Sequence, residues 1–145
     1  MTAPAGIDPR GPRFTASVTA VVFVIALLVP DGAATSLIAL QAGFFALGAG
    51  LGVQHTPTGL VFRHLIRPRL TPTAELEDPT PPRFAQGVGL AFTGVAIAGY
   101  LSGAVLMAQV AVGFALVAAL LNAGFAFCLG CEMYLLGARL IQHTS

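Results

Sequence analysis

The sequence DPRGPRF at residues 8–14 returns 70 residues later as DPTPPRF at residues 78–84, and a long apolar segment follows each copy. Further residues match at the same offset: Gly43 with Gly113, Phe44 with Phe114 and Arg69 with Arg139. Self-similarity at a fixed spacing indicates an internal repeat. The copies differ most at residues 58–61, TGLV, which become CLGC at residues 128–131. We therefore expect two related halves, of which only the second carries a cysteine pair.

The composition is that of a membrane protein. Only 9% of the 145 residues are charged, 56% are hydrophobic and the mean hydropathy is +0.84, whereas a soluble domain has about 25% charged residues. Seven Arg against six acidic residues give a net charge of +1, so we expect no nucleic-acid partner. Two Cys are too few for a disulfide-rich scaffold. The lipid bilayer is the expected environment.

Four apolar segments have the length of a membrane-spanning helix, which needs about 20 apolar residues to cross roughly 30 Å of hydrocarbon. The predicted spans are residues 14–29, 36–53, 84–101 and 104 to about 127. We divide the chain into an N-terminal segment (1–13), a first hairpin (14–69), a linker (70–83) and a second hairpin (84–140). The linker is rich in Pro and contains Glu75, Glu77 and Asp78, so we expect it to be polar.

The arginines predict the orientation. All seven lie before the first predicted span, between the second and third spans, or after the fourth, and none lies in the short loop within either hairpin. Because basic residues are retained in the cytoplasm, both termini should be cytoplasmic. The predicted fold class is an all-α membrane protein with four transmembrane helices, arranged as two parallel-repeat helical hairpins about a pseudo-two-fold axis along the membrane normal.

Two other patterns bear on contacts. Small residues at helical spacing, such as Ala42, Ala46 and Gly50, indicate close helix packing within the bundle or, alternatively, contacts in a homo-oligomer. Residues 59–67, GLVFRHLIR, combine apolar and basic side chains at near-helical spacing. This segment predicts a helix on the membrane surface with its Arg side chains at the headgroups, or alternatively a binding site for an acidic partner.

Reactive side chains gather at residues 127–134, FCLGCEMY. At 1.5 Å per residue, a span that starts at Ala104 leaves the hydrocarbon just before these residues. We expect the helix to continue unbroken to Leu140, which places Cys128 and Cys131 on one face at the cytoplasmic interface. A short, strained bridge between them is then possible. The alternative is that both cysteines only fill space in the core.

Three further residues surround this pair in our prediction. Glu132 would disfavour a thiolate if ionised, unless Arg139 neutralises it, and it could instead accept a proton. His55 ends the second span at the equivalent level and could activate a thiol, although an interfacial His more commonly forms a hydrogen bond. The candidate catalytic residues are Cys128, Cys131, Glu132 and His55.

Two further features are a possible zinc site and an amide side chain deep in the fourth span. His55 and Glu132 with both cysteines, or four cysteines from two chains, would be the minimum for a zinc site, and we expect no metal and no cofactor. Asn122 lies deeper in the fourth span. An amide at that depth needs a partner, so we expect it to hydrogen-bond another helix.

Three motifs together resemble one known family: IDPRGPRF at residues 7–14, ELEDP with PRF between residues 75 and 84, and FCLGCE at residues 127–132. From about residue 7 to 141 the chain is similar to the bacterial domain of unknown function 4395, a set of small integral membrane proteins without an assigned activity. The resemblance implies a multi-pass protein of the bacterial cytoplasmic (inner) membrane. Family members often appear beside thioredoxin-like and rhodanese-like proteins, which implies thiol redox or sulfur transfer.

The leading hypothesis is a membrane thiol-redox or sulfur-transfer component that works through Cys128 and Cys131 with a thioredoxin-like or rhodanese-like partner. One alternative is a small transporter or channel subunit whose hairpins line a path for a small sulfur species. Another is a scaffold that holds a soluble enzyme through the acidic linker. The sequence leaves open whether the chain is an enzyme.

Overall fold

The computed structural model describes residues 6–72 and 76–144, and it is helical throughout apart from its connecting segments. The four long helices are α1 (Arg10–Leu28), α2 (Asp31–Leu51), α4 (Thr80–Ser102) and α5 (Val105–Phe125). The shorter elements are the 3₁₀-helices η1 (Val53–His55) and η3 (Arg67–Arg69), α3 (Pro57–Val61), the π-helix η2 (Phe62–Ile66) and α6 (Leu129–Thr144). Residues 1–5 of the predicted N-terminal segment and 73–75 of the predicted linker, including Glu75, lie outside the described residues.

The four predicted spans are confirmed as helices that are long and apolar enough to cross a membrane, with 19, 21, 23 and 21 residues. Large apolar side chains face outward along them. Leu28, Leu101, Leu106 and Phe125 are each at least 75% exposed, which water would oppose and lipid favours. The chain therefore has the features of a multi-pass membrane protein.

Carboxylates set where the helices begin, several residues earlier than the hydropathy predicts. The Asp8 carboxylate accepts a hydrogen bond from the amide of Arg10 at the start of α1, and Asp78 does the same for Thr80 at the start of α4, at 3.0 and 2.9 Å. Asp31 occupies the first turn of α2. Negative charge at a helix N-terminus satisfies free amides and complements the helix dipole.

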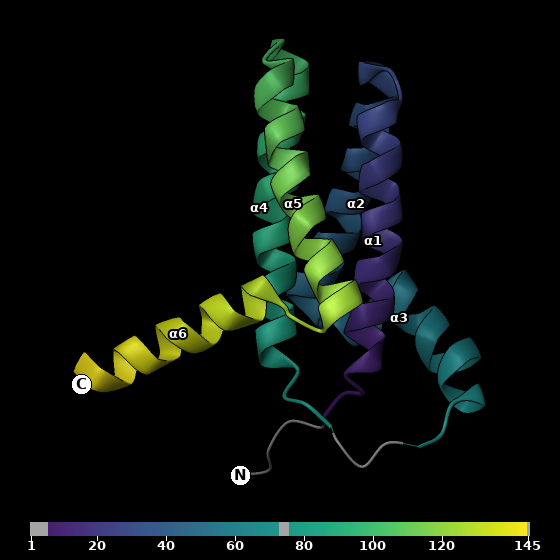
Figure 1. Ribbon diagram of the computed structural model, residues 1–145, viewed down its shortest axis with the longest axis vertical. Coiled ribbons are helices and arrows are strands. Elements are labelled where there is room, and N and C mark those ends of the chain that lie inside the picture. The colour runs from purple at the N-terminus through teal and green to yellow at the C-terminus, as the bar shows by residue number, and fades with distance from the viewer. Residues whose placement is uncertain (1–5, 73–75, 145) are drawn as a thin grey trace.

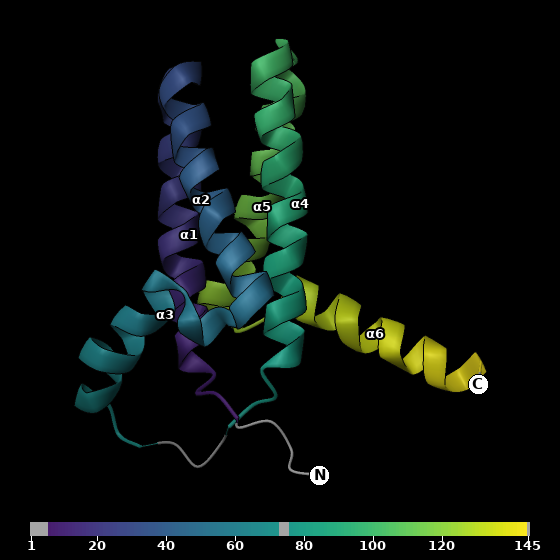
Figure 2. The same cartoon turned by 180° about the vertical axis from the view of Figure 1, so that it is seen from behind.

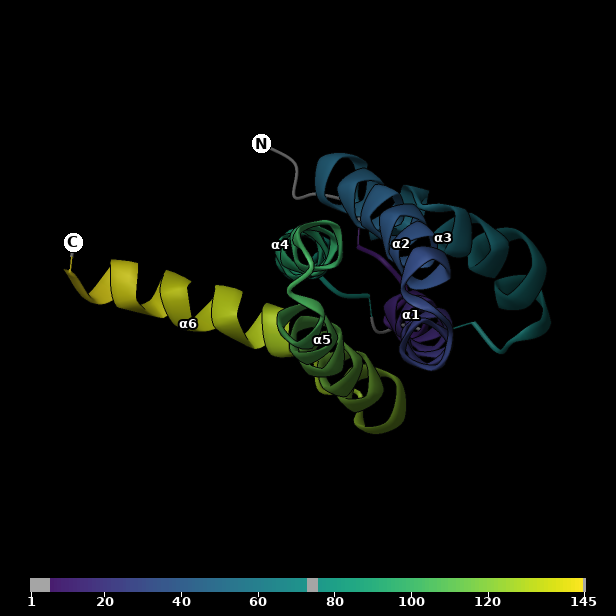
Figure 3. The same ribbon diagram turned by 90° about the horizontal axis from the view of Figure 1, so that it is seen from above.

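The four long helices run side by side, with both hairpin turns at one end of the bundle (Figures 1 and 2). The described parts of the N-terminal segment and of the linker, together with α3 and α6, lie at the other end. Seen from above, α1 packs mainly on α5 and α2 mainly on α4, so each hairpin meets the other along its length (Figure 3). The core between them contains Phe23, Ala26, Ile38, Phe45, Ala96, Ala108 and Val112.

Backbone pairing and two arginines join the halves at the polar end. Ile7 and Glu77, which are 70 residues apart, each donate a 2.9 Å amide hydrogen bond to the carbonyl of the other. Arg13 of α1 donates to the Ala123 carbonyl near the end of α5 at 3.1 Å. Arg83 of α4 donates to two carbonyls at the end of α2, at 2.6 and 2.5 Å. Each arginine thus caps the second helix of the other hairpin.

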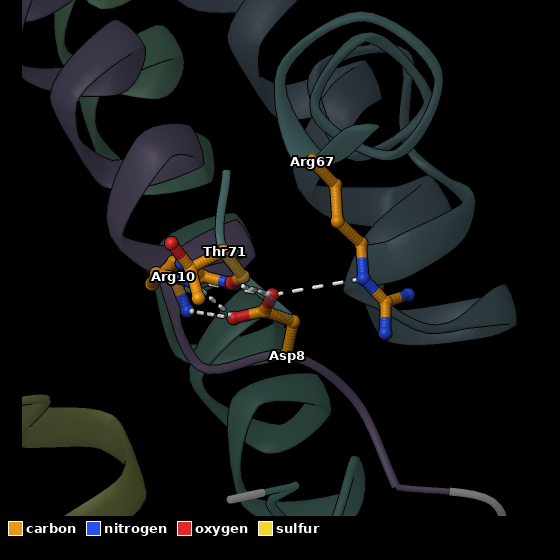
Figure 4. A network of polar contacts seen from close by, with 4 residues as sticks. All are labelled: Asp8, Arg10, Arg67 and Thr71. Carbon is orange, nitrogen blue, oxygen red and sulfur yellow. Dashed lines mark hydrogen bonds and ion pairs between the residues drawn. The ribbon is translucent and has the colours of Figure 1, made fainter. Parts of the chain in front are cut away.

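A buried carboxylate ties the N-terminal segment to the start of the linker (Figure 4). The Asp8 side chain is 3% exposed and lies 2.7 Å from the Arg10 guanidinium and 3.6 Å from that of Arg67. Arg10 also donates to the Thr71 carbonyl at 3.1 Å. The hydrogen bond from Arg10 lowers the pKa of Asp8 despite its burial, so the carboxylate is ionised near neutral pH.

Two helical arms leave the bundle in opposite directions at this end (Figure 1). One is the run α3, η2 and η3, so residues 59–67 are helical as predicted, and its Phe62 is buried with its ring centroid 6.1 Å from that of Phe14. The other arm is α6, whose Leu136, Leu140 and Ile141 are more than half exposed. That either arm lies on a membrane surface stays a prediction.

Candidate functional site around the cysteine pair

A break in the chain places the cysteine pair, and it corrects the expected unbroken helix. α5 ends at Phe125 and α6 begins at Leu129. Ala126 is left-handed with φ 55°, and the amide of Phe127 donates to the Leu121 carbonyl at 3.2 Å. This bond, together with that from the Ala126 amide, satisfies the Leu121 carbonyl in the last turn of α5, as in a turn that ends a helix with a left-handed residue. The chain then turns outward, and Cys128 becomes the residue that precedes the first turn of α6.

Cys128 and Cys131 form a disulfide across that first turn, with their Cα atoms 5.2 Å apart. The Cys128 sulfur also accepts a hydrogen bond from the Cys131 amide at 3.1 Å. This is an N-capping geometry. In the other arm, the Thr56 hydroxyl accepts from the Gly59 amide at 3.1 Å in the same way. Cys128 and Thr56 therefore occupy the same capping position at the starts of α6 and α3, whereas the gapless alignment pairs Cys128 with Thr58.

The N-terminal turn of α6 favours negative charge on Cys128 when the disulfide is reduced. Free amides and the positive end of the helix dipole stabilise a thiolate at this position. Cys131, one turn further on, lacks this advantage. The two sulfurs are therefore chemically distinct, and Cys128 is the better nucleophile of the two.

Two contacts fix the start of α6 against α4. A Cβ atom placed on Gly130 would lie 2.6 Å from both Cα and Cβ of Ala85, so only glycine allows this approach. Next to it, the rings of Phe84 and Tyr134 have centroids 5.7 Å apart. The sequence gives no reason to single out Ala85, because the contact depends on the direction in which α6 leaves the bundle.

A cavity of about 600 Å³ lies between the hairpins, and the cysteine pair lines it. It extends from Cys128 and Cys131 to aromatic rings in the middle of the spans, among them Phe23 and Phe92. Glu77, Asp78 and Glu132 line its polar end. Such a volume is in the range of small-molecule sites, so a ligand in it would lie beside the disulfide.

The structure brings together three of the four predicted site residues and separates the fourth. Cys128, Cys131 and Glu132 share the cavity, whereas His55 lines a second pocket of about 290 Å³ with Asp8 and Arg63 among its walls. Glu132 is exposed, and its amide donates to the Cys128 carbonyl at 3.0 Å. Its predicted neutralisation by Arg139 is not observed, since the ion pairs of the described residues are those of Asp8.

Two amide side chains belong to the site in a way that the sequence did not indicate. Asn122 of α5 and Gln86 of α4 both line the cavity. Within the described residues neither side chain forms a hydrogen bond, so the predicted bond from Asn122 to another helix is wrong. Among those residues, no three His, Cys, Asp or Glu side chains are grouped as metal ligands.

Comparison with known proteins identifies a family. The family model described as domain of unknown function (DUF4395) matches residues 7–139, nearly the whole chain. No curated protein and no solved structure matches the chain significantly.

Proposed function

The chain belongs to the family described as domain of unknown function (DUF4395), and from its site we propose that it is a membrane thiol-redox component that exchanges electrons with a soluble partner through Cys128 and Cys131. One observation carries the proposal: the two cysteines are disulfide-bonded across the first turn of α6, in the wall of a cavity. A cysteine that only fills space needs neither a helix N-terminus nor a cavity. Reversible exchange needs both a stabilised thiolate and access.

The exchange proceeds in two steps. A thiolate of the partner attacks the Cys128 sulfur, the disulfide breaks, and Cys131 leaves as a thiolate that takes up a proton. A second partner thiol then attacks the mixed disulfide and expels the Cys128 thiolate, which the N-terminus of α6 stabilises. Two electrons and two protons pass from the partner dithiol to the pair. The exposed Glu132 carboxylate can accept the proton of an attacking thiol, and His55, in the other pocket, takes no part.

A thioredoxin-like protein is the partner that fits this chemistry, because it carries a dithiol of its own. A rhodanese-like partner would instead bring a persulfide. The Cys128 thiolate of the reduced pair would accept the outer sulfur, and the partner would leave as a thiolate. Both reactions begin on Cys128, but only the exchange with a dithiol passes through a mixed disulfide with the partner, so trapping tests the thioredoxin-like partner.

We also propose that the bundle is two repeated hairpins in the bacterial inner membrane, with both termini in the cytoplasm. The reciprocal pairing of Ile7 with Glu77 supports this, because residues on a two-fold axis meet their own counterparts. The matching caps by Arg13 and Arg83 support it too. The end of the bundle that carries both arms also carries the arginines, which favours a cytoplasmic location for the cysteines.

Differential alkylation in membrane vesicles tests the function and the orientation together. A membrane-impermeant maleimide is applied to inside-out and right-side-out vesicles before and after treatment with a reductant. We expect labelling of Cys128 and Cys131 from the cytoplasmic side only, and only after reduction.

Cys131→Ser should then trap a mixed disulfide between Cys128 and the partner, and Cys128→Ser should not. The thermal unfolding of both variants controls for loss of folding. If the pair resists reduction from both sides in a folded protein, or if neither variant traps a partner, the cysteines are structural and the proposal fails.

A further inference from the structure

Gln86 and Asn122 are amide side chains of the long helices that line the cavity without a hydrogen bond to the described residues. Gln86 lies one and a half turns after the start of α4, and Asn122 lies one turn before the end of α5. In the cavity wall the Gln86 amide lies beside Gly48 of α2. Inside a membrane an amide without a partner is costly, since no lipid group can replace the lost hydrogen bonds.

The buried polar side chains Gln41 and Thr93 find partners inside the protein. Gln41 donates to the Thr19 hydroxyl at 3.4 Å, and the Thr93 hydroxyl donates to backbone carbonyls of its own helix at 3.0 Å. Both residues are almost fully buried. Gln86 and Asn122 differ because they line a space large enough for a ligand. Their free donors and acceptors therefore point to a molecule with polar atoms that enters the cavity.

The remaining residues that line the cavity indicate the chemical character of the rest of that molecule. Its walls within the spans are apolar and aromatic, with Phe23, Phe45, Phe92 and Phe114 among them. Two of these rings also reach the outer surface of the bundle, because Phe92 is 37% and Phe114 is 63% exposed. The cavity wall is thus continuous with the surface that faces lipid. A ligand that dissolves in the bilayer can approach from this side, while a charged metabolite cannot.

We infer that this cavity binds a lipid-soluble quinone, which oxidises the reduced Cys128–Cys131 pair; this inference rests on the proposed thiol exchange. A quinone has an apolar ring and tail and two carbonyl oxygens, to which the amide hydrogens of Gln86 and Asn122 can donate. At Gly130 the first turn of α6 contacts Ala85 of α4, which precedes Gln86 in the chain. The amide of Gln86 and the cysteines therefore belong to the same end of the cavity.

The electrons balance in this step without a further reactant. The two S–H bonds of Cys128 and Cys131 break and one S–S bond forms, so the sulfurs lose two electrons. The quinone gains these two electrons, and each of its oxygens gains one proton, which gives the hydroquinone. The disulfide is then ready for the next partner dithiol.

The test uses the full chain in lipid nanodiscs, reduced and then freed of reductant without oxygen. Ubiquinone-1 is the probe, because its fully substituted ring is not alkylated by thiols. Loss of quinone absorbance and loss of free thiols are followed together, and we expect one quinone consumed per cysteine pair. Gln86→Leu and Asn122→Leu should each slow the reaction about tenfold, the effect of one buried hydrogen bond.

Matched variants separate the cavity from the fold. Gln109→Leu makes the same change on the exposed side of α5, and it should leave the rate unchanged. Ala118→Phe fills the cavity and should abolish quinone reduction, whereas Ala98→Phe on the exposed side of α4 should not. Exchange of the oxidised proteins with reduced thioredoxin should be normal in these three variants and in Gln86→Leu and Asn122→Leu.

The outcomes separate the two proposals. Quinone reduction that depends on both cysteines, Gln86 and Asn122 supports the inference. If thioredoxin exchange is normal but ubiquinone-1 is reduced no faster than by the double Cys→Ser variant, the quinone site is wrong and the thiol function stands. If neither reaction occurs in folded protein, both proposals fail.

Discussion

Replacing Gly130 by Ala tests whether the contact between α6 and α4 holds the cysteine pair in place. The added Cβ would lie 2.6 Å from Cα and Cβ of Ala85, whereas carbon atoms pack at about 3.5–4.0 Å. The first turn of α6 must therefore move by about 1 Å. Overpacking of this kind costs about 1–3 kcal/mol, so the population with a detached first turn should rise about 5- to 140-fold.

Hydrogen exchange measures this population, because the exchange rate of a protected amide scales with its open fraction. The amides of Cys131 and Glu132 report on the turn, since both are bonded to Cys128. The matched control is Gly137→Ala in the same helix, where an added Cβ meets nothing within 4 Å. That change should slow exchange slightly through higher helix propensity.

A second variant sharpens the test. Ala85→Gly removes one of the two atoms that the new Cβ meets, so in the Gly130→Ala background it should restore part of the protection. Equal exchange in Gly130→Ala and Gly137→Ala would refute the idea that this contact positions the cysteines.

Three further predictions concern the polar end of the bundle. Arg83→Ala removes two hydrogen bonds to the end of α2 and should cost about 1 kcal/mol, seen as a lower thermal midpoint in detergent that Arg83→Lys partly restores. The pKa of the Asp8 carboxylate is lowered in the folded protein. The stability that this carboxylate adds is therefore present above its ordinary pKa of 3.8, and it is lost as the pH falls through the lower pKa of the folded protein. Proteolysis of the linker should rise in that pH range, and Asp8→Asn should remove the pH dependence. Thr56→Ala removes the N-cap of α3 and should destabilise the fold by about 1 kcal/mol in chemical unfolding, while Thr56→Ser should not.

The spans were predictable because length and apolar character determine what can cross a bilayer. Their starts were predicted less well. Hydropathy places the first span at Phe14 and the second at Ser36, but α1 starts at Arg10 and α2 at Asp31. Asp8 and Asp31 lower the hydropathy at the very positions where their carboxylates favour a helix N-terminus.

The path of the chain after α5 was not predictable from local sequence. Ala is the strongest helix former, yet Ala126 is the left-handed residue at which the helix ends. Tertiary contacts of Gly130 and Tyr134 with α4 favour this turn, and they involve residues more than 40 positions away. The repeat spacing likewise predicts that His55 lies at the level of the cysteines, but it does not predict the side of the bundle, and His55 lines the second pocket.

The cross-packing of the hairpins has a consequence for biosynthesis. Ribosomes add about 5–20 residues per second, so the 70 residues that separate the two halves take roughly 4–14 s. During that interval α1 and α2 are already in the bilayer. The face of α1 that will contact α5, and the face of α2 that will contact α4, can meet only lipid or other proteins. We therefore expect the first hairpin to depend on the insertion machinery or on a chaperone until the second hairpin is inserted. A chain that ends in the linker should be cleared by membrane proteases, and supplying the second half as a separate polypeptide should rescue it.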